Sequence, residues 1–166
     1  PPPKPPKPDE SPPPPPRPAL SIPAAEVTPG MCHMLLSIVP MTTAVITPAS
    51  YDGDDPLPVL LDPYGGPHAL RVQKAQSAFA ASQWFADQGF VVVVADGRGT
   101  PGRGSDYERA VFGDLAQPVL DDQVAVLDAL PMLEPRADVA RVAIRGWSFG
   151  GYLAALAVLR RPDKFH

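Results

Sequence analysis

Short apolar runs alternate with helical patterns along residues 42–166 and predict the elements of an α/β protein. Runs that are β-branched or apolar throughout predict strands at 42–47, 59–62, 90–95 and 141–145. Apolar residues at helical spacing predict helices at 75–88, at roughly 119–133 and, after the last strand, at 153–159. Strands that alternate with helices in this way indicate a mainly parallel sheet with right-handed crossovers.

The helices carry further detail. Leu120, Val124, Leu127 and Leu130 fall on one face of the 119–133 helix, which should therefore pack on the sheet. The segment 153–159 is apolar almost all round, as expected for a buried helix. The loops after Asp62, Ala95 and Arg145 all follow predicted strands, so they should leave the sheet at the carboxyl end of its strands, where α/β proteins place their chemistry.

The loop after Arg145 carries the pattern Gly146-x-Ser148-x-Gly150. In this pattern a serine is held on a sharp turn between a strand and a helix, and the glycines are needed because a Cβ would collide with neighbouring backbone. The predicted strand before the pattern and the predicted helix after it supply that context. Ser148 is therefore a candidate nucleophile.

A serine nucleophile that attacks a carbonyl needs hydrogen-bond donors for the developing oxyanion. In a turn of this kind one donor is the backbone N–H of the next residue, here Phe149, and the second comes from the loop after an earlier strand. That loop is residues 63–68, and its Tyr64 has a side-chain hydroxyl that could donate. A tyrosine ring packed on the sheet edge is the structural alternative.

The loop after Ala95 also matches a pattern, because Gly97, Gly99 and Gly102 have the spacing of a dinucleotide-binding turn. Such a site needs a helix that opens at the third glycine and meets the pyrophosphate with its N-terminus. Pro101, Gly102 and Gly104 oppose a helix there. The pattern is interpreted as a tight loop beside the serine, and we expect no cofactor and no metal.

The N-terminal part has a different composition. Residues 1–29 contain 14 of the 25 prolines and almost no large apolar side chains. Such a segment buries too little surface to offset the entropy of ordering, so residues 1–40 are predicted to be a disordered, proline-rich tail or linker before a domain at 41–166. Residues 5–8 and 13–18 could dock on an SH3- or WW-type groove, although a solvated linker is favoured.

Charge and cysteine content exclude several classes of partner. A net charge of -4 provides no basic surface for nucleic acid or an anionic membrane, and we expect neither partner. The longest apolar run, residues 31–46, is interrupted and too short to span a bilayer. The single cysteine, Cys32, gives no sign of an oxidising compartment, and the sequence leaves the localisation unknown with the cytoplasm favoured.

Three stretches resemble the catalytic domain of the prolyl oligopeptidase family of serine peptidases, in its dipeptidyl peptidase IV-like branch. They are residues 60–68 (LLDPYGGPH), 94–99 (VADGRG) and 146–152 (GWSFGGY), and the similarity extends over about residues 42–166. The resemblance implies an α/β-hydrolase fold, with Ser148 as nucleophile and the Tyr64 hydroxyl and Phe149 N–H as oxyanion donors. It also implies a peptide substrate that is cleaved after proline by a dipeptidyl peptidase or an oligopeptidase.

The remaining catalytic groups are not evident. In this fold the acid and the histidine follow the serine, and only Asp163 and His166 do so, roughly 20 Å away along the predicted helix. His68 precedes the serine and is interpreted as a structural loop residue. The chain is therefore expected to be a truncated α/β-hydrolase domain, nearly inactive by itself. An esterase or acyl-peptide hydrolase is the near alternative, and a non-catalytic interaction module recruited by the tail is the distant one.

Overall fold

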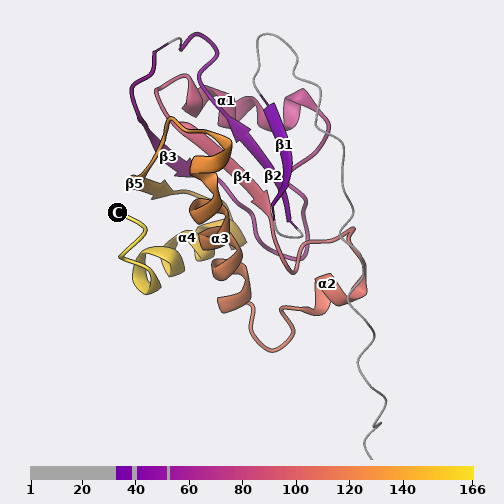
Figure 1. Cartoon of the computed structure of the whole chain (residues 1–166). Coiled ribbons are helices and arrows are strands. Elements are labelled where there is room, and N and C mark those ends of the chain that lie inside the picture. Colours follow the sequence, from indigo (N-terminus) through magenta and orange to yellow (C-terminus); the bar gives the residue numbers. More distant parts are fainter. Residues whose placement is uncertain (1–32, 39–40, 52) are drawn as a thin grey trace, which may run out of the picture.

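The computed structural model describes residues 33–38, 41–51 and 53–166, which form one sheet covered by helices (Figure 1). Within these residues the sheet has five strands in the order β1-β2-β4-β3-β5. The strands are β1 (His33–Ile38), β2 (Met41–Ile46), β3 (Leu57–Leu61), β4 (Val91–Asp96) and β5 (Ala137–Ile144). β4, β3 and β5 run parallel to one another, whereas β2 pairs antiparallel with β4 and β1 pairs antiparallel with β2. The sheet is thus mixed, with its parallel part carrying the loops of interest.

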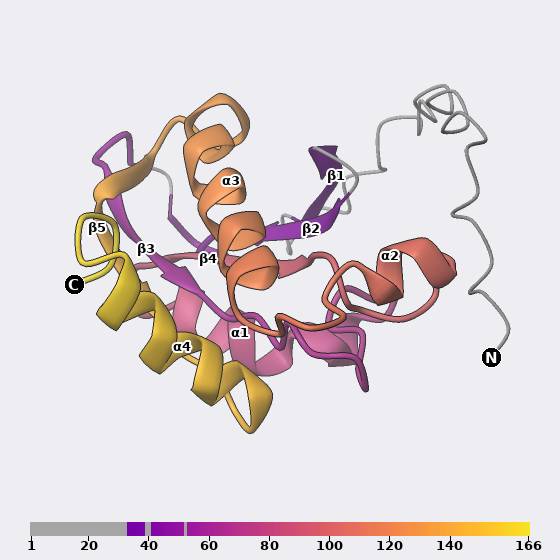
Figure 2. The ribbon, with the colours of Figure 1, turned by 90° about the horizontal axis from the view of Figure 1, so that it is seen from below.

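The helices lie in the connections between the strands. They are the 3-10 helix η1 (Gln76–Phe79), α1 (Ala80–Ala86), α2 (Ser105–Arg109), α3 (Gln117–Leu133) and α4 (Phe149–Arg160). Seen from below, α3 and α1 lie on opposite sides of the sheet (Figure 2). The crossovers therefore cover both faces, as parallel strands require.

β4 shows how its sequence produces this layering. All of its residues are buried, and successive side chains of a strand point to opposite faces. Val91, Val93 and Ala95 join the core under α3 and α4, while Val92 and Val94 join the core under α1. An uninterrupted apolar run is what a strand covered on both faces needs, and this central strand could be predicted for that reason.

The predicted elements are found with shifted ends. The 75–88 helix is divided into η1 and α1, and it stops where Gly89 takes a φ of +96°. The four predicted core residues of α3 are all buried. β1 was not predicted; it lies inside residues 1–40, so the sheet begins before residue 41. The remainder of the predicted tail, with its two candidate docking sequences, lies outside the described residues.

The C-terminal elements lie at one edge of the described structure. β5, which corresponds to the strand predicted at 141–145, is the end strand of the sheet. The following helix was expected to be buried all round, yet Val158 and Leu159 of α4 are 44% and 80% exposed. α4 packs on the core through Leu153, Ala157 and the partly buried Leu156, and no described element covers its outer face.

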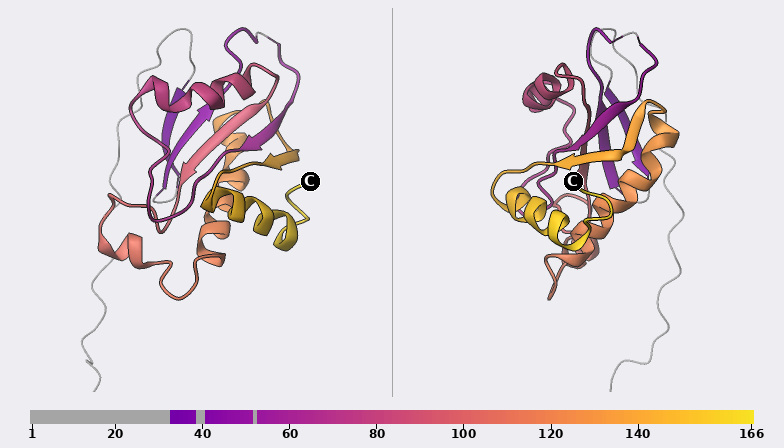
Figure 3. Two further views of the ribbon diagram at one scale, coloured as in Figure 1. Left: turned by 180° about the vertical axis from the view of Figure 1, so that it is seen from behind. Right: turned by 90° about the vertical axis from the view of Figure 1, so that its left-hand side faces the viewer.

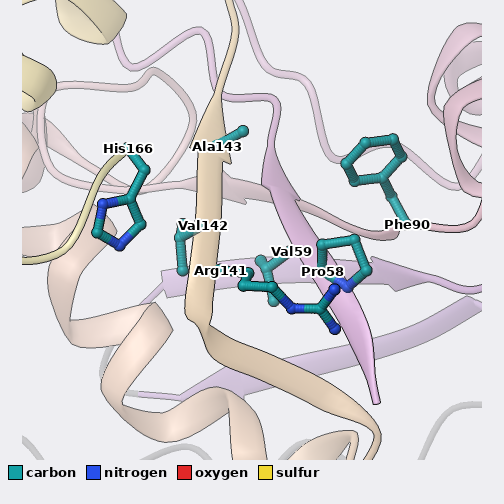
Figure 4. A pocket seen from close by; sticks show the side chains of 7 residues that line it. All are labelled: Pro58, Val59, Phe90, Arg141, Val142, Ala143 and His166. Carbon is teal, nitrogen blue, oxygen red and sulfur yellow. The ribbon is translucent and has the colours of Figure 1, made fainter. Parts of the chain in front are cut away.

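The chain returns to β5 at its C-terminus, as both views of Figure 3 show. The backbone N–H of His166 donates to the carbonyl of Val142, at 3.1 Å. Beside this contact lies an open, mainly apolar cavity of about 380 Å³, lined by Pro58, Val59, Phe90, Arg141, Val142, Ala143 and His166 (Figure 4). None of the candidate site residues lines this cavity, so it belongs to the sheet edge.

Candidate active site

Ser148 occupies a strained turn between β5 and α4. Its backbone has φ 57° and ψ -118°, and it is the only residue other than glycine with a positive φ in the described part of the chain. Such a conformation costs on the order of 1–3 kcal/mol and persists only where the surroundings enforce it. The residue is exposed, so its hydroxyl is accessible from solvent.

The flanking glycines enforce the turn by allowing backbone segments to touch. A Cβ on Gly146 would lie 2.2 Å from both the carbonyl carbon and the oxygen of Gly150. Within the turn, the Gly150 N–H donates to Trp147 O at 2.9 Å, and the Tyr152 N–H donates to Ser148 O at 3.1 Å. The expected strand, turn and helix are therefore present, and the two glycines have the steric role that the sequence assigned to them.

The Tyr64 loop, residues 63–70, contacts this turn directly. A Cβ on Gly150 would lie 2.5 Å from the carbonyl oxygen of Pro63, so the loop backbone rests on the first turn of α4. The rings of Tyr64 and Phe149 are 6.2 Å apart between centroids and tilted by 46°. The structure thus brings together the three residues singled out in the sequence, Ser148, Phe149 and Tyr64.

A buried carboxylate below these residues was not identified from the sequence. Asp62 is 2% exposed and accepts hydrogen bonds from Arg71 Nη2 at 2.7 Å and from Ser82 Oγ at 3.1 Å. Its other oxygen lies 3.6 Å from Nε of Arg145. A signal was present, because an aspartate directly follows the apolar run of β3, and a carboxylate is an unusual group to bury without a partner.

A second buried carboxylate, that of Asp96 at the end of β4, holds the segment that follows the Tyr64 loop. Asp96 accepts hydrogen bonds from the N–H of Val72 at 2.8 Å and from the N–H of Arg71. Burial raises the pKa of the Asp96 carboxyl above its ordinary value, and these two N–H groups and the Arg71 charge only partly oppose the rise. Burial also raises the pKa of Tyr107, whose hydroxyl donates to the Asp96 carbonyl, to about 12.

The glycines of the loop after β4 do not form a dinucleotide turn. Residues 97–104 contain no helix, and α2 begins only at Ser105. A Cβ on Gly97 would lie 2.6 Å from Oδ2 of Asp122, which itself accepts the Arg98 N–H and pairs with the Arg98 guanidinium at 2.7 Å. The loop is therefore tied to α3 through Asp122, in agreement with the interpretation of a tight loop.

The remaining candidates for the base and its acid are His68, Asp163 and His166. His68 is exposed on the Tyr64 loop. Asp163 pairs with Arg161 at 2.7 Å, and His166 lies against β5 beside Val142. In the described part of the chain, no hydrogen bond or ion pair connects Asp163 or His166 with Ser148.

Among the residues that the structure describes, no group of three or more histidine, cysteine, aspartate or glutamate side chains is placed to hold a metal ion. Nor does that part of the chain contain a helix with the length and apolar character to cross a membrane.

An accessible serine on a glycine-flanked turn, at the carboxyl end of a parallel strand and before a helix, is the arrangement of the α/β-hydrolases. Comparison with known proteins agrees. The model of the prolyl oligopeptidase family, Peptidase_S9, matches residues 76–166. The chain is 40% identical over 113 residues to human dipeptidyl peptidase 8, covering 65% of this chain and 12% of the relative. It is 34% identical over 115 residues to human prolyl endopeptidase FAP, covering 69% of this chain and 15% of that relative.

Solved structures extend the likeness to the fold. The Porphyromonas gingivalis dipeptidyl peptidase 4 superposes with a TM-score of 0.70 at 32% identity, over 81% of this chain and 19% of that one. A dipeptidyl aminopeptidase IV structure from Bacteroides ovatus gives the same TM-score at 33% identity, over 75% of this chain and 18% of that one. The chain belongs to the prolyl oligopeptidase family of serine peptidases and has part of its α/β-hydrolase fold. It spans less than a fifth of these relatives.

Proposed function

We propose that this chain carries the nucleophile and the oxyanion donors of a serine peptidase that cleaves peptide bonds after proline. The observation that carries the proposal is the contact between two loops at Gly150. This glycine packs against Gly146 in the strained turn of the exposed Ser148, and it also packs against the backbone of Pro63 in the Tyr64 loop. Family membership and the names of the relatives, a dipeptidyl peptidase and a prolyl endopeptidase, favour this chemistry over other acyl transfers.

In the proposed reaction the Ser148 hydroxyl attacks the scissile carbonyl carbon, and its proton passes to a general base. The carbonyl oxygen becomes an oxyanion that accepts hydrogen bonds from the Phe149 N–H and the Tyr64 hydroxyl. Phe149 is the first residue of α4, and the first N–H groups of a helix have no acceptor within it. Collapse of the intermediate releases the amine and leaves an acyl group on Ser148, which water then removes.

The base and its orienting acid are proposed to come from outside these 166 residues, because Asp163 is paired with Arg161 and the backbone of His166 is held against β5 by its bond to Val142. The chain alone should then hydrolyse peptides hardly at all. What remains would be the contribution of binding and oxyanion stabilisation, roughly 10³ to 10⁴ over water in enzymes that have lost their triad.

A fluorophosphonate probe tests the proposal, because it reacts with an activated serine and leaves a covalent adduct whose position mass spectrometry can map. We expect slow labelling of Ser148 in the folded chain, abolished by Ser148→Ala. Tyr64→Phe removes one oxyanion donor and should slow labelling about 10²-fold or more. Tyr152→Phe is the matched control, since Tyr152 also packs on Phe149, with ring centroids 5.5 Å apart, and should leave the rate unchanged.

A folded sample that is not labelled at all would refute the proposal and support the non-catalytic module. Equal rates in the wild type and Tyr64→Phe would retain Ser148 as nucleophile but remove Tyr64 from the oxyanion site. An esterase substrate hydrolysed faster than any peptide by a longer chain that supplies the base would favour the esterase or acyl-peptide hydrolase alternative.

A further inference from the structure

Asp62 occupies a position shared by the two loops of the site. It directly follows β3, and its side chain is 2% exposed. Tyr64 lies two residues further along the chain. A carboxylate at this depth is costly unless cations and hydrogen-bond donors surround it, so the groups that it contacts are held firmly in return.

The partners of Asp62 come from both sides of the site. Arg71, at the far end of the Tyr64 loop, places Nη2 at 2.7 Å from the carboxylate and so closes the loop by an ion pair between its two ends. Arg145, three residues before Ser148, approaches the other carboxylate oxygen at 3.6 Å. One side chain therefore connects the Tyr64 loop with the strand that carries the serine.

The far end of the loop is fixed a second time by Asp96 at the end of β4. Both carboxylate oxygens of Asp96 accept from the N–H of Arg71, and one accepts from Val72. Arg71 thus connects the end of β3, through Asp62, with the end of β4, through Asp96. Asp62 also pairs with Arg145, which directly follows β5. The peptide between these anchors includes Tyr64, and its ends are held by the two carboxylates in addition to the core packing of Leu61 and Val72.

The balance of charge makes this arrangement sensitive to Asp62. A single carboxylate faces two guanidinium groups. Arg145 lies over the Phe85 ring at 4.3 Å, and its Nη1 is buried without a hydrogen-bond partner in the described part of the chain. If Asp62 lost its charge, only the Phe85 ring would remain beside the positive charge of Arg145. We therefore expect both arginines to move toward solvent.

We propose that Asp62 is a positioning residue, whose buried carboxylate fixes the Tyr64 loop relative to the Ser148 turn through Arg71 and Arg145. The inference rests on the proposed function in one respect, namely that Tyr64 assists reaction at Ser148. Asp62 itself touches neither the substrate nor the reacting atoms. Asp62 must therefore affect reactivity indirectly, through the position of the Tyr64 ring.

The first test is the rate of fluorophosphonate labelling in a double-mutant cycle. Asp62→Asn keeps the shape of the side chain and removes its charge, and it should slow labelling at least about tenfold, because small displacements of a positioned group have effects of this size. In the Tyr64→Phe background the same substitution should change the rate less than about twofold, because the group through which Asp62 acts is already absent.

Asp122→Asn is the matched control. Asp122 is likewise buried and paired with an arginine, Arg98 at 2.7 Å, but it holds the loop after β4 and not the Tyr64 loop. We expect a comparable loss of thermal stability with no slowing of labelling. If both variants slow labelling equally at matched stability, Asp62 is only a structural residue and the inference is overturned.

The second test does not depend on reactivity. The chain has four tyrosines, so ring-labelled ¹³C-tyrosine gives a short spectrum that Tyr→Phe variants assign. Asp62→Asn should shift or broaden the Tyr64 signal and leave that of Tyr51 in place, whereas Asp122→Asn should leave Tyr64 in place. A Tyr64 signal that is unmoved in Asp62→Asn overturns the inference.

The two readouts separate the inference from the proposed function. A wild type that is never labelled, together with a Tyr64 signal that moves in Asp62→Asn, refutes the function and retains the positioning. If the wild type is labelled and Asp62→Asn is labelled at the same rate, the positioning role of Asp62 is refuted and the proposed function is retained. If Asp62→Asn does not fold, Arg71→Gln replaces it, because Arg71 is 32% exposed and its removal breaks the same 2.7 Å contact; the same shift of Tyr64 and slower labelling are then expected.

Discussion

Two glycine-rich turns follow β4 and β5, the strands on either side of β3, and they differ in what their glycines accommodate. After β5, Gly146 makes room for backbone, since its missing Cβ would lie 2.2 Å from the carbonyl group of Gly150. After β4, Gly97 makes room for a side chain, since its missing Cβ would lie 2.6 Å from a carboxylate oxygen of Asp122. Both turns match a functional glycine pattern, but only the first has the geometry that the pattern describes.

The difference shows that the neighbour of a glycine matters more than the spacing of glycines in the sequence. Backbone contact at Gly146 and Gly150 brings the helix α4 against the strand end and forces Ser148 into its positive φ. At Gly97 the side-chain contact lets Asp122 of α3 pair with Arg98, and no helix opens at Gly102. The first turn exposes a reactive group, and the second fastens a loop.

The largest effect is expected for Gly146→Ala. Backbone atoms at 2.2 Å cannot move aside without separating α4 from β5, so the substitution should destabilise the fold by about 3 kcal/mol and abolish labelling of Ser148. Denaturant unfolding and fluorophosphonate labelling measure the two losses. Gly151→Ala is the control: its Cβ would meet Gly146 O at an ordinary 3.4 Å inside α4, where alanine favours the helix. Equal stability of the two variants would contradict the role given to Gly146.

Gly97→Ala should have a smaller effect, because a side chain can yield where backbone cannot. Displacing Asp122 from Arg98 should cost about 1–2 kcal/mol, with labelling of Ser148 retained. The cost should fall in part in the Asp122→Ala background, because the carboxylate is gone while the Cβ of residue 122, at 2.8 Å from the added Cβ, remains. If the substitution costs the same with and without Asp122, the contact between Gly97 and Asp122 is not what requires the glycine.

The contrast also shows how far the sequence could be interpreted. Apart from the short helix α2, the strands and helices of 41–166 could be predicted because their signals are local: β4 is a continuous apolar run, and the core face of α3 repeats at helical spacing. The turn at Ser148 could be predicted because strand, glycines and helix are consecutive in the chain. Tyr64 could be singled out because the loop that supplies a second donor in this fold follows an earlier strand.

What the sequence did not reveal depends on contacts between distant residues. Asp62 and Arg145 are 83 positions apart, and their ion pair exists only because β3 and β5 are neighbours in the sheet. The exposed face of α4 could not be foreseen for a similar reason, since apolar composition does not say which elements are present to cover a helix. β1 lies within the apolar run of residues 31–46, but it directly follows the proline-rich segment and was included with it in the predicted tail.

The smallest effect, with the opposite sign, is expected for Ser148→Gly, which examines the strain of the first turn directly. At φ 57° and ψ -118° a glycine has no Cβ to strain, so the substitution should stabilise the fold by about 1 kcal/mol while removing the hydroxyl. Ser77→Gly, at an exposed position of η1, is the control and should be destabilising by about 0.5–1 kcal/mol, since glycine loses more entropy there. Opposite signs in denaturant unfolding would show that the turn stores strain at the serine. A loss of stability at both positions would mean that the backbone of Ser148 is relaxed, and that the glycines of the turn only permit close packing.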